Sequence, residues 1–219
     1  MEISTSILSI KEENPIQTFY DIEVAKTDYF HIDVMDGKFV KQDTSKLMLE
    51  SAQSIKHISN VPLDVHFMVE DVENYIEEYL PLNPAYITVH YESFKDKIKI
   101  KDIINKIKEE GVKVGISIKP VTQVEEIKEF LPFVNLVLVM TVEPGYGGQT
   151  FMQENVSKIK ELKEYAEANN FEYYIEADGG INLETINQVK DAGCDIAVVG
   201  TAIVSAEDKK EMIRKLKEM

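Results

Sequence analysis

Short runs of apolar and β-branched residues alternate along the chain with longer amphipathic segments. The short runs predict eight strands, over Ile3–Leu8, Tyr29–Met35, Leu63–Met68, Tyr86–His90, Val112–Ile118, Leu136–Met140, Glu172–Ala177 and Ile196–Gly200. Helical periodicity is clearest over Ile98–Glu110, Val121–Phe130, Val156–Asn169 and Leu183–Ala192, and a last amphipathic helix is expected over Lys209–Met219. Strands that alternate with helices in this way predict an α/β fold with a parallel sheet.

Eight strands favour closure of that sheet into a (β/α)8 TIM barrel, and we expect residues 1–219 to form one such domain. The alternative is an open, doubly wound sheet. The first strand, however, is not followed by the glycine-rich turn that binds dinucleotides in such sheets.

In a barrel of this kind the active site lies at the carboxyl ends of the strands. Polar or chemically useful residues occupy these predicted ends in most of the strands. They are Ser6, His31, Asp33, His66, His90, Ser117, Lys119, Met140, Thr141, Asp178, Gly200 and Thr201.

Four of these residues form a candidate metal site. Residues that alternate along a strand face the same side, so His31 and Asp33 project together from the second strand. His66 and Asp178 end the third and seventh strands, where a barrel would direct them toward the same place. Two imidazoles and two carboxylates suit one divalent ion, Zn²⁺, Fe²⁺, Mn²⁺ or Co²⁺.

The two carboxylates, Asp33 and Asp178, could also act as a paired acid and base. A site with one base on each face of a substrate can invert a stereocentre without an organic cofactor. A bound cation would stabilise the negative charge that develops when a proton is removed. This combination favours an isomerase.

Three late loops are rich in glycine, which allows backbone N–H groups to turn toward an anion. They contain Gly145, Tyr146, Gly147 and Gly148 after the sixth strand, Gly179 and Gly180 after the seventh, and Gly200 and Thr201 after the eighth. Barrels often bind phosphate after the last two strands. We therefore expect a phosphorylated substrate.

Composition narrows the possible partners and location. The formal charge of −15 argues against nucleic acid or an anionic membrane. No apolar run approaches the ~20 residues needed to span a bilayer, and the first residues lack the pattern of a signal peptide. These features predict a cytoplasmic protein. Cys194 is the only cysteine and is expected to be a buried packing residue.

Taken together, the motifs resemble the ribulose-phosphate 3-epimerase family over nearly the whole chain. The similar stretches are Ser6–Ser9, His31–Gly37, Pro62–Val69, Ile87–His90, Val137–Phe151, Asp178–Asn182 and Val199–Ile203. The resemblance implies a barrel of the ribulose-phosphate binding type. It also implies metal-dependent interconversion of D-ribulose 5-phosphate and D-xylulose 5-phosphate, a step of the pentose phosphate pathway.

The resemblance also implies roles for single residues. His31, Asp33, His66 and Asp178 would hold the metal, and Asp33 and Asp178 would exchange protons with the substrate through an enediolate. Ser6 and His66 would contact the sugar, and the glycine loops would bind its phosphate. Thioethers matching the family's pocket are Met35, Met68 and Met140. A small phosphorylated ketose is the implied partner, and a homo-oligomer the implied assembly.

The chain departs from the family pattern at Lys38–Asp43, Lys119 and Ala177, which leaves other functions open. A 3-epimerase of a six-carbon ketose phosphate, such as D-allulose 6-phosphate, would use the same four ligands. An aldolase could form a Schiff base on Lys119. A phosphosugar-binding protein without catalytic activity is the third alternative.

Overall fold

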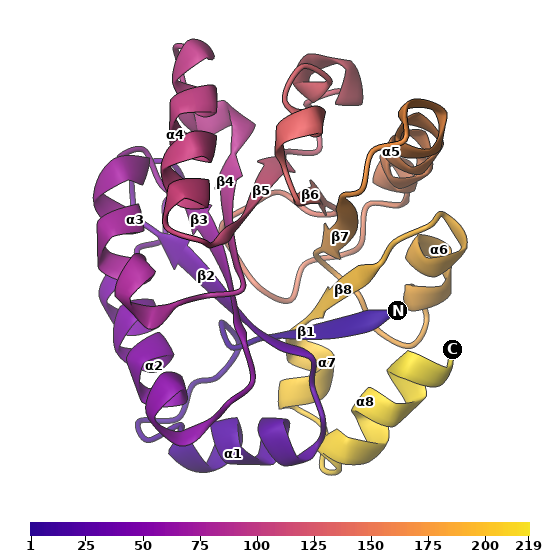
Figure 1. Cartoon of the computed structure of the whole chain (residues 1–219). Coiled ribbons are helices and arrows are strands. Elements are labelled where there is room, and N and C mark those ends of the chain that lie inside the picture. The colour runs from indigo at the N-terminus through magenta and orange to yellow at the C-terminus, as the bar shows by residue number, and fades with distance from the viewer.

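Eight parallel strands form a closed barrel with helices around it in the computed structural model, which describes residues 1–219 (Figure 1). The strands are β1 (Glu2–Ser6), β2 (Tyr29–Met35), β3 (Leu63–Met68), β4 (Tyr86–His90), β5 (Lys113–Ile118), β6 (Leu136–Met140), β7 (Tyr174–Asp178) and β8 (Ile196–Val199). Each strand pairs with the next in chain order, and β8 pairs with β1. This closure confirms the predicted barrel.

Eight α-helices cover the strands: α1 (Ile16–Val24), α2 (Ser45–Ile58), α3 (Val72–Tyr79), α4 (Ile98–Glu109), α5 (Val156–Asn169), α6 (Ile186–Asp191), α7 (Thr201–Val204) and α8 (Lys209–Glu218). Short 3₁₀ helices are η1 (Leu80–Leu82), η2 (Tyr91–Ser93), η3 (Val124–Ile127), η4 (Leu131–Phe133) and η5 (Gln153–Asn155). No helix combines the length and the apolar character that crossing a bilayer requires.

Alternation along the strands divides the buried side chains into two groups. One face of every strand packs against the helices in a cluster of 51 buried apolar residues. The opposite face points into the barrel, where a second cluster contains Tyr86, Leu136, Leu138, Met140, Val142 and Ile196. The remaining inward positions, mainly from β1 to β5 and on β7, include buried polar residues, among them Ser4, His31, Asp64, His66, Ser117 and Glu176. The barrel interior is therefore polar on one side, and the site lies there.

The predicted helix over Val121–Phe130 is wrong. The segment forms only η3, followed by η4, so that β5 and β6 are joined without an α-helix. Its buried apolar residues are Val124, Ile127 and Phe130. A spacing of three residues matches the 3₁₀ helix, in which side chains at i and i+3 align.

Several predicted boundaries also shift near the site. β1 ends at Ser6 rather than Leu8, and β8 ends at Val199 rather than Gly200. β7 begins at Tyr174, where pairing with Leu136 starts, and Asp178 is its last residue. α6 begins at Ile186 rather than Leu183, and the Asn182 side chain accepts a hydrogen bond from the Glu184 N–H in the turn before it. Cys194 is buried and its thiol donates to a backbone carbonyl, which confirms its packing role.

Gly115 lies inside the barrel directly beside Thr88 on the neighbouring strand. A Cβ at Gly115 would collide with the Thr88 hydroxyl and lie 3.0 Å from Leu136 Cδ2. We expect Gly115→Ala to lower the free energy of unfolding by about 1–3 kcal/mol, measured by urea denaturation, because overpacking forces neighbours to move.

Thr88→Ala supplies the matched background for this test, because the buried Thr88 hydroxyl has no hydrogen-bond partner to lose. In that background Gly115→Ala should cost clearly less than in the wild type. Equal costs in both backgrounds would show that the Thr88 hydroxyl is not the obstacle.

Candidate functional site

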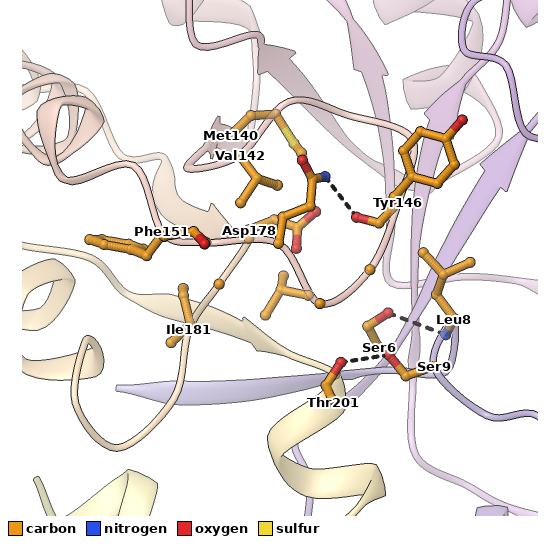
Figure 2. Close-up of a pocket in the computed structure, with 18 of the residues that line it drawn as sticks. Ser6, Leu8, Ser9, Met140, Val142, Tyr146, Phe151, Asp178, Ile181 and Thr201 are labelled. Carbon is orange, nitrogen blue, oxygen red and sulfur yellow. Dashed lines mark hydrogen bonds between the residues drawn. The ribbon is translucent and has the colours of Figure 1, made fainter.

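A cavity of about 660 Å³ opens at the carboxyl ends of the strands (Figure 2). Fourteen of the sequence-predicted site residues line it: Ser6, Asp33, Met35, Met68, Met140, Gly145, Tyr146, Gly147, Gly148, Asp178, Gly179, Gly180, Gly200 and Thr201. His31 and His66 do not line the cavity, because both imidazoles are completely buried. The structure thus brings the predicted residues together. The carboxylates of Asp33 and Asp178 face the cavity, and the imidazoles of His31 and His66 are buried behind them.

The register of β2 and β3 places the candidate metal ligands close to one another. Asp33 pairs with His66 across these strands, and its Oδ1 lies 3.3 Å from His31 Nε2 and 3.4 Å from His66 Nδ1. Asp178 Oδ2 approaches His66 Nδ1 to 3.9 Å. One donor atom from each of the four residues lies within 4.8 Å of the others.

Two properties of this cluster fit a divalent cation. First, His31 Nε2 and His66 Nδ1 are buried and have no hydrogen-bond partner, which is costly unless something else satisfies them. Second, the carboxylates favour positive charge between them. Burial opposes a charge on His31, yet Asp64 and Asp33 raise its pKa well above the ordinary value. Mixed imidazole and carboxylate donors suit first-row transition metals and zinc.

The pKa values of the two carboxyl groups that line the cavity are shifted in opposite directions. Burial, together with the neighbouring Asp33 charge, raises the pKa of Asp178 to about 6. Burial also opposes ionisation of Asp33, but His31 and His66 lower its pKa below the ordinary value. The Ser6 hydroxyl donates to Asp33 Oδ2 at 2.8 Å and fixes its orientation. Such a difference between two adjacent carboxyls is typical of an acid–base pair.

Sequence reasoning missed the residues that support His31. Asp64 Oδ2 lies 2.6 Å from His31 Nδ1 and accepts a hydrogen bond from the Ser4 hydroxyl at 2.8 Å. Glu176, completely buried, lies 3.9 Å from the same imidazole nitrogen. Period-two alternation could have found both, because Asp64 precedes His66 by two residues and Glu176 precedes Asp178 by two.

Glycines shape the other end of the cavity. Gly179 and Gly180 have φ values of +123° and +68°, which side chains rarely adopt. A Cβ at Gly180 would lie 2.6 Å from the Phe151 backbone nitrogen, so the two loops pack backbone to backbone.

Hydrogen bonds hold these loops in place. The Gln149 amide donates to the carbonyls of Glu143 and Tyr146, at 2.6 and 2.8 Å, and closes the loop after β6. The hydroxyls of Ser9 and Thr201 lie 2.9 Å apart across the cavity from Met140 and Asp178 (Figure 2).

Lys119 does not line the cavity. Its ammonium lies 3.8 Å from the centre of the Phe39 ring, a cation–π contact with the loop after β2. In that loop, Asp36 Oδ1 accepts from the N–H groups of Lys38 and Phe39, and Asp36 forms a β-bridge with Asp43. The altered segments therefore contact each other, and Lys119 is not placed for a Schiff base with a ligand of the cavity.

The fold and the site define an α/β-barrel enzyme whose cavity places paired carboxylates beside glycine-rich loops. Within this class the chain belongs to the ribulose-phosphate 3-epimerase family, a family of carbohydrate epimerases, whose model matches residues 2–204.

Full-length relatives support the same assignment. Ribulose-phosphate 3-epimerase from Methanocaldococcus jannaschii is 36% identical over 218 residues, covering 100% of this chain and 90% of the relative. The enzyme of the same name from Bacillus subtilis is 35% identical, covering 99% and 98%. The chloroplastic ribulose-5-phosphate-3-epimerase of Arabidopsis thaliana is 33% identical, covering 98% and 75%.

Solved structures share the fold at low identity. A 3-hexulose-6-phosphate synthase superposes with a TM-score of 0.71 at 14% identity, over 100% of this chain and 99% of that one. The 3-hexulose-6-phosphate synthase of Salmonella typhimurium gives 0.68 at 19% identity, over 100% and 97%. At these identities the likenesses show the barrel fold alone.

Proposed function

We propose that the protein is a metal-dependent epimerase that interconverts D-ribulose 5-phosphate and D-xylulose 5-phosphate by inversion at C3. The observation that carries the proposal is the cluster of His31, Asp33, His66 and Asp178, whose two carboxylates line a cavity that glycine loops also line. The names of the relatives at 33–36% identity supply the pentulose substrate.

His31 Nε2, His66 Nδ1 and one oxygen each of Asp33 and Asp178 would hold one divalent ion. When bound, such an ion polarises the oxygens of the substrate next to the reacting carbon and makes its proton more acidic. The ligand set suits Zn²⁺, Fe²⁺, Mn²⁺ or Co²⁺. No organic cofactor is needed for a reaction that begins and ends with a proton transfer.

Asp33 and Asp178 would move the proton. They reach the cluster from β2 and β7, and a substrate between them would face one carboxylate on each side. One accepts the C3 proton, and the other donates a proton to the opposite face of the enediolate. The pKa of Asp178 is raised and that of Asp33 is lowered, so Asp178 is the better proton donor of the pair and Asp33 is the group that stays ionised.

The phosphate of the substrate would bind at the glycine loops. Backbone N–H groups around Gly147, Gly179 and Gly200 are the candidates, because the chain carries a net charge of −15 and no lysine or arginine lines the cavity. We assign the sugar contacts to Ser6 and the thioethers of Met35, Met68 and Met140, all of which line the cavity. His66, the other expected sugar contact, does not line it.

The other predicted properties accompany this proposal. Residues 1–219 would act as one domain, and a homo-oligomer formed through outer helices stays a prediction. The six-carbon alternative is not favoured by the pentulose names of the relatives. The aldolase alternative lacks a lysine in the cavity.

The test compares epimerase activity on ribulose 5-phosphate and allulose 6-phosphate, using metal-stripped protein and protein restored with each of the four metals. We expect turnover of the pentulose phosphate only when metal is present. Turnover that persists after verified stripping would contradict the metal-dependent mechanism, and preference for allulose 6-phosphate would reassign the substrate.

A further inference from the structure

His66 is supported by a chain of side chains that leads away from the cavity. Its Nε2 lies 3.0 Å from His90 Nε2, and the two rings stack with centroids 4.9 Å apart. His90 Nδ1 in turn lies 2.8 Å from Glu92 Oε2. His31, by contrast, contacts a carboxylate directly. The ring nitrogen of His31 that faces away from the cluster therefore contacts the carboxylate of Asp64, whereas that of His66 contacts a second imidazole, His90.

The hydrogen-bond partners along this chain favour one order of protons. His90 Nε2 also lies 3.4 Å from Ser117 Oγ, a hydroxyl that can donate to it in that order. Glu92 is an acceptor: burial opposes its charge, but hydrogen bonds from His90 and Thr122 lower its pKa to about 2. His90 must then carry its proton on Nδ1 to donate to Glu92. His90 is completely buried, and a neutral imidazole carries a single proton, so Nε2 is left as an acceptor.

The order continues into the metal cluster. Because His90 Nε2 accepts, His66 donates from Nε2 and carries no proton on Nδ1. Nδ1 is the atom that faces Asp33 and Asp178 and has no hydrogen-bond partner. The reverse order would place a proton on that atom and set the lone pair of His90 Nδ1 against the Glu92 carboxylate.

Glu92 is itself held in place by the chain after β5. The Lys119 backbone N–H donates to its Oε1 at 2.8 Å, and the Thr122 hydroxyl donates to the same oxygen. The other oxygen, Oε2, is thereby left for His90. The Phe39 ring closes over His90 at a centroid distance of 4.9 Å.

We propose that Glu92 and His90 are positioning residues that fix the tautomer of His66, keeping Nδ1 free to bind a divalent cation. This inference rests on the proposed function. A hydrogen-bonded partner behind a ligating imidazole typically changes metal affinity by 10–100-fold when it is removed.

Glu92→Gln tests the direction of the chain. The glutamine Oε1 would keep its hydrogen bonds with Lys119 and Thr122, so its amide nitrogen would replace the oxygen that faces His90. His90 would then accept at Nδ1 and donate from Nε2, which drives the His66 proton onto Nδ1. We expect Zn²⁺ affinity, measured by competition with a chelator, to fall about 10–100-fold.

Glu126→Gln is the control for this variant. It removes the same charge from the segment after β5 but has no contact with His90. The control variant should therefore bind Zn²⁺ as the wild type does.

The second readout needs no activity and no metal. Long-range ¹H–¹⁵N spectra of metal-free wild-type protein should show His66 protonated on Nε2 and His90 on Nδ1, and Glu92→Gln should reverse both. A wild-type His66 protonated on Nδ1 overturns the proposal, whether or not the variant folds. The proposal is also overturned if Glu92→Gln leaves the tautomers of His66 and His90 and the Zn²⁺ affinity unchanged. Wild-type protein that binds no divalent metal would instead overturn the metal centre of the proposed function, while the spectra still decide the tautomers.

Discussion

Asp178→Asn is expected to lower kcat on ribulose 5-phosphate by about 10²–10⁴-fold, the usual contribution of a general acid or base. The asparagine side chain would be nearly isosteric and would keep an amide oxygen for the cluster, but it cannot exchange a proton at neutral pH. Binding of the phosphosugar, measured by calorimetry, should survive, because the glycine loops are unchanged. Asp191→Asn, an equal change of charge at an exposed position, should leave kcat unchanged.

Hydrogen exchange distinguishes loss of one proton-transfer group from loss of the whole site. In D₂O the variant retains Asp33, which can remove a C3 proton on its own side and return a deuteron to the same side. Deuterium should therefore enter one epimer without inversion. Unchanged turnover in Asp178→Asn would remove Asp178 from the mechanism. Loss of C3 deuterium exchange in both epimers would instead indicate that Asp178 acts by holding the metal.

The features that sequence predicted best depend on local pattern. β2 is observed over the predicted Tyr29–Met35, and its alternation placed His31 and Asp33 correctly on one face. The glycine loops were also predicted to lie at the site from their positions after β6, β7 and β8, and they line the cavity. Closure of the barrel followed from the count of strands, which is a property of the whole chain.

The features that sequence missed depend on pairing between distant strands. Asp64 supports His31 only because β2 and β3 align in one register, and His90 reaches His66 across β3 and β4. Nothing local distinguishes Glu92 from the other acidic residues of a chain with 39 of them. The helix predicted after Lys119 failed for another reason: the apolar residues there repeat every three positions, which fits a 3₁₀ helix better than an α-helix.

Gly180→Ala is expected to lower kcat/KM by about 100-fold, because a displacement of the order of 1 Å at a binding loop can have that effect. The added Cβ would lie 2.6 Å from the Phe151 nitrogen and 2.7 Å from its Cα. Backbone cannot rotate away as a side chain can, so the loop after β7 and the segment after the β6 loop must separate. Since both loops face the proposed phosphate, the loss should appear mainly in KM for the phosphosugar.

Gly111→Ala separates this collision from backbone strain. Gly111 has a similar φ, +77° against +68° for Gly180, but a Cβ there would meet nothing within 4 Å. Both variants should lose about 1–2 kcal/mol of stability from the left-handed conformation, while only Gly180→Ala should lose kcat/KM. Equal kinetic losses in the two variants would attribute the effect to stability, and a normal KM in Gly180→Ala would place the phosphate elsewhere. Comparison of the two variants therefore tests whether the close approach of Gly180 to Phe151 is needed for phosphate binding or only for stability.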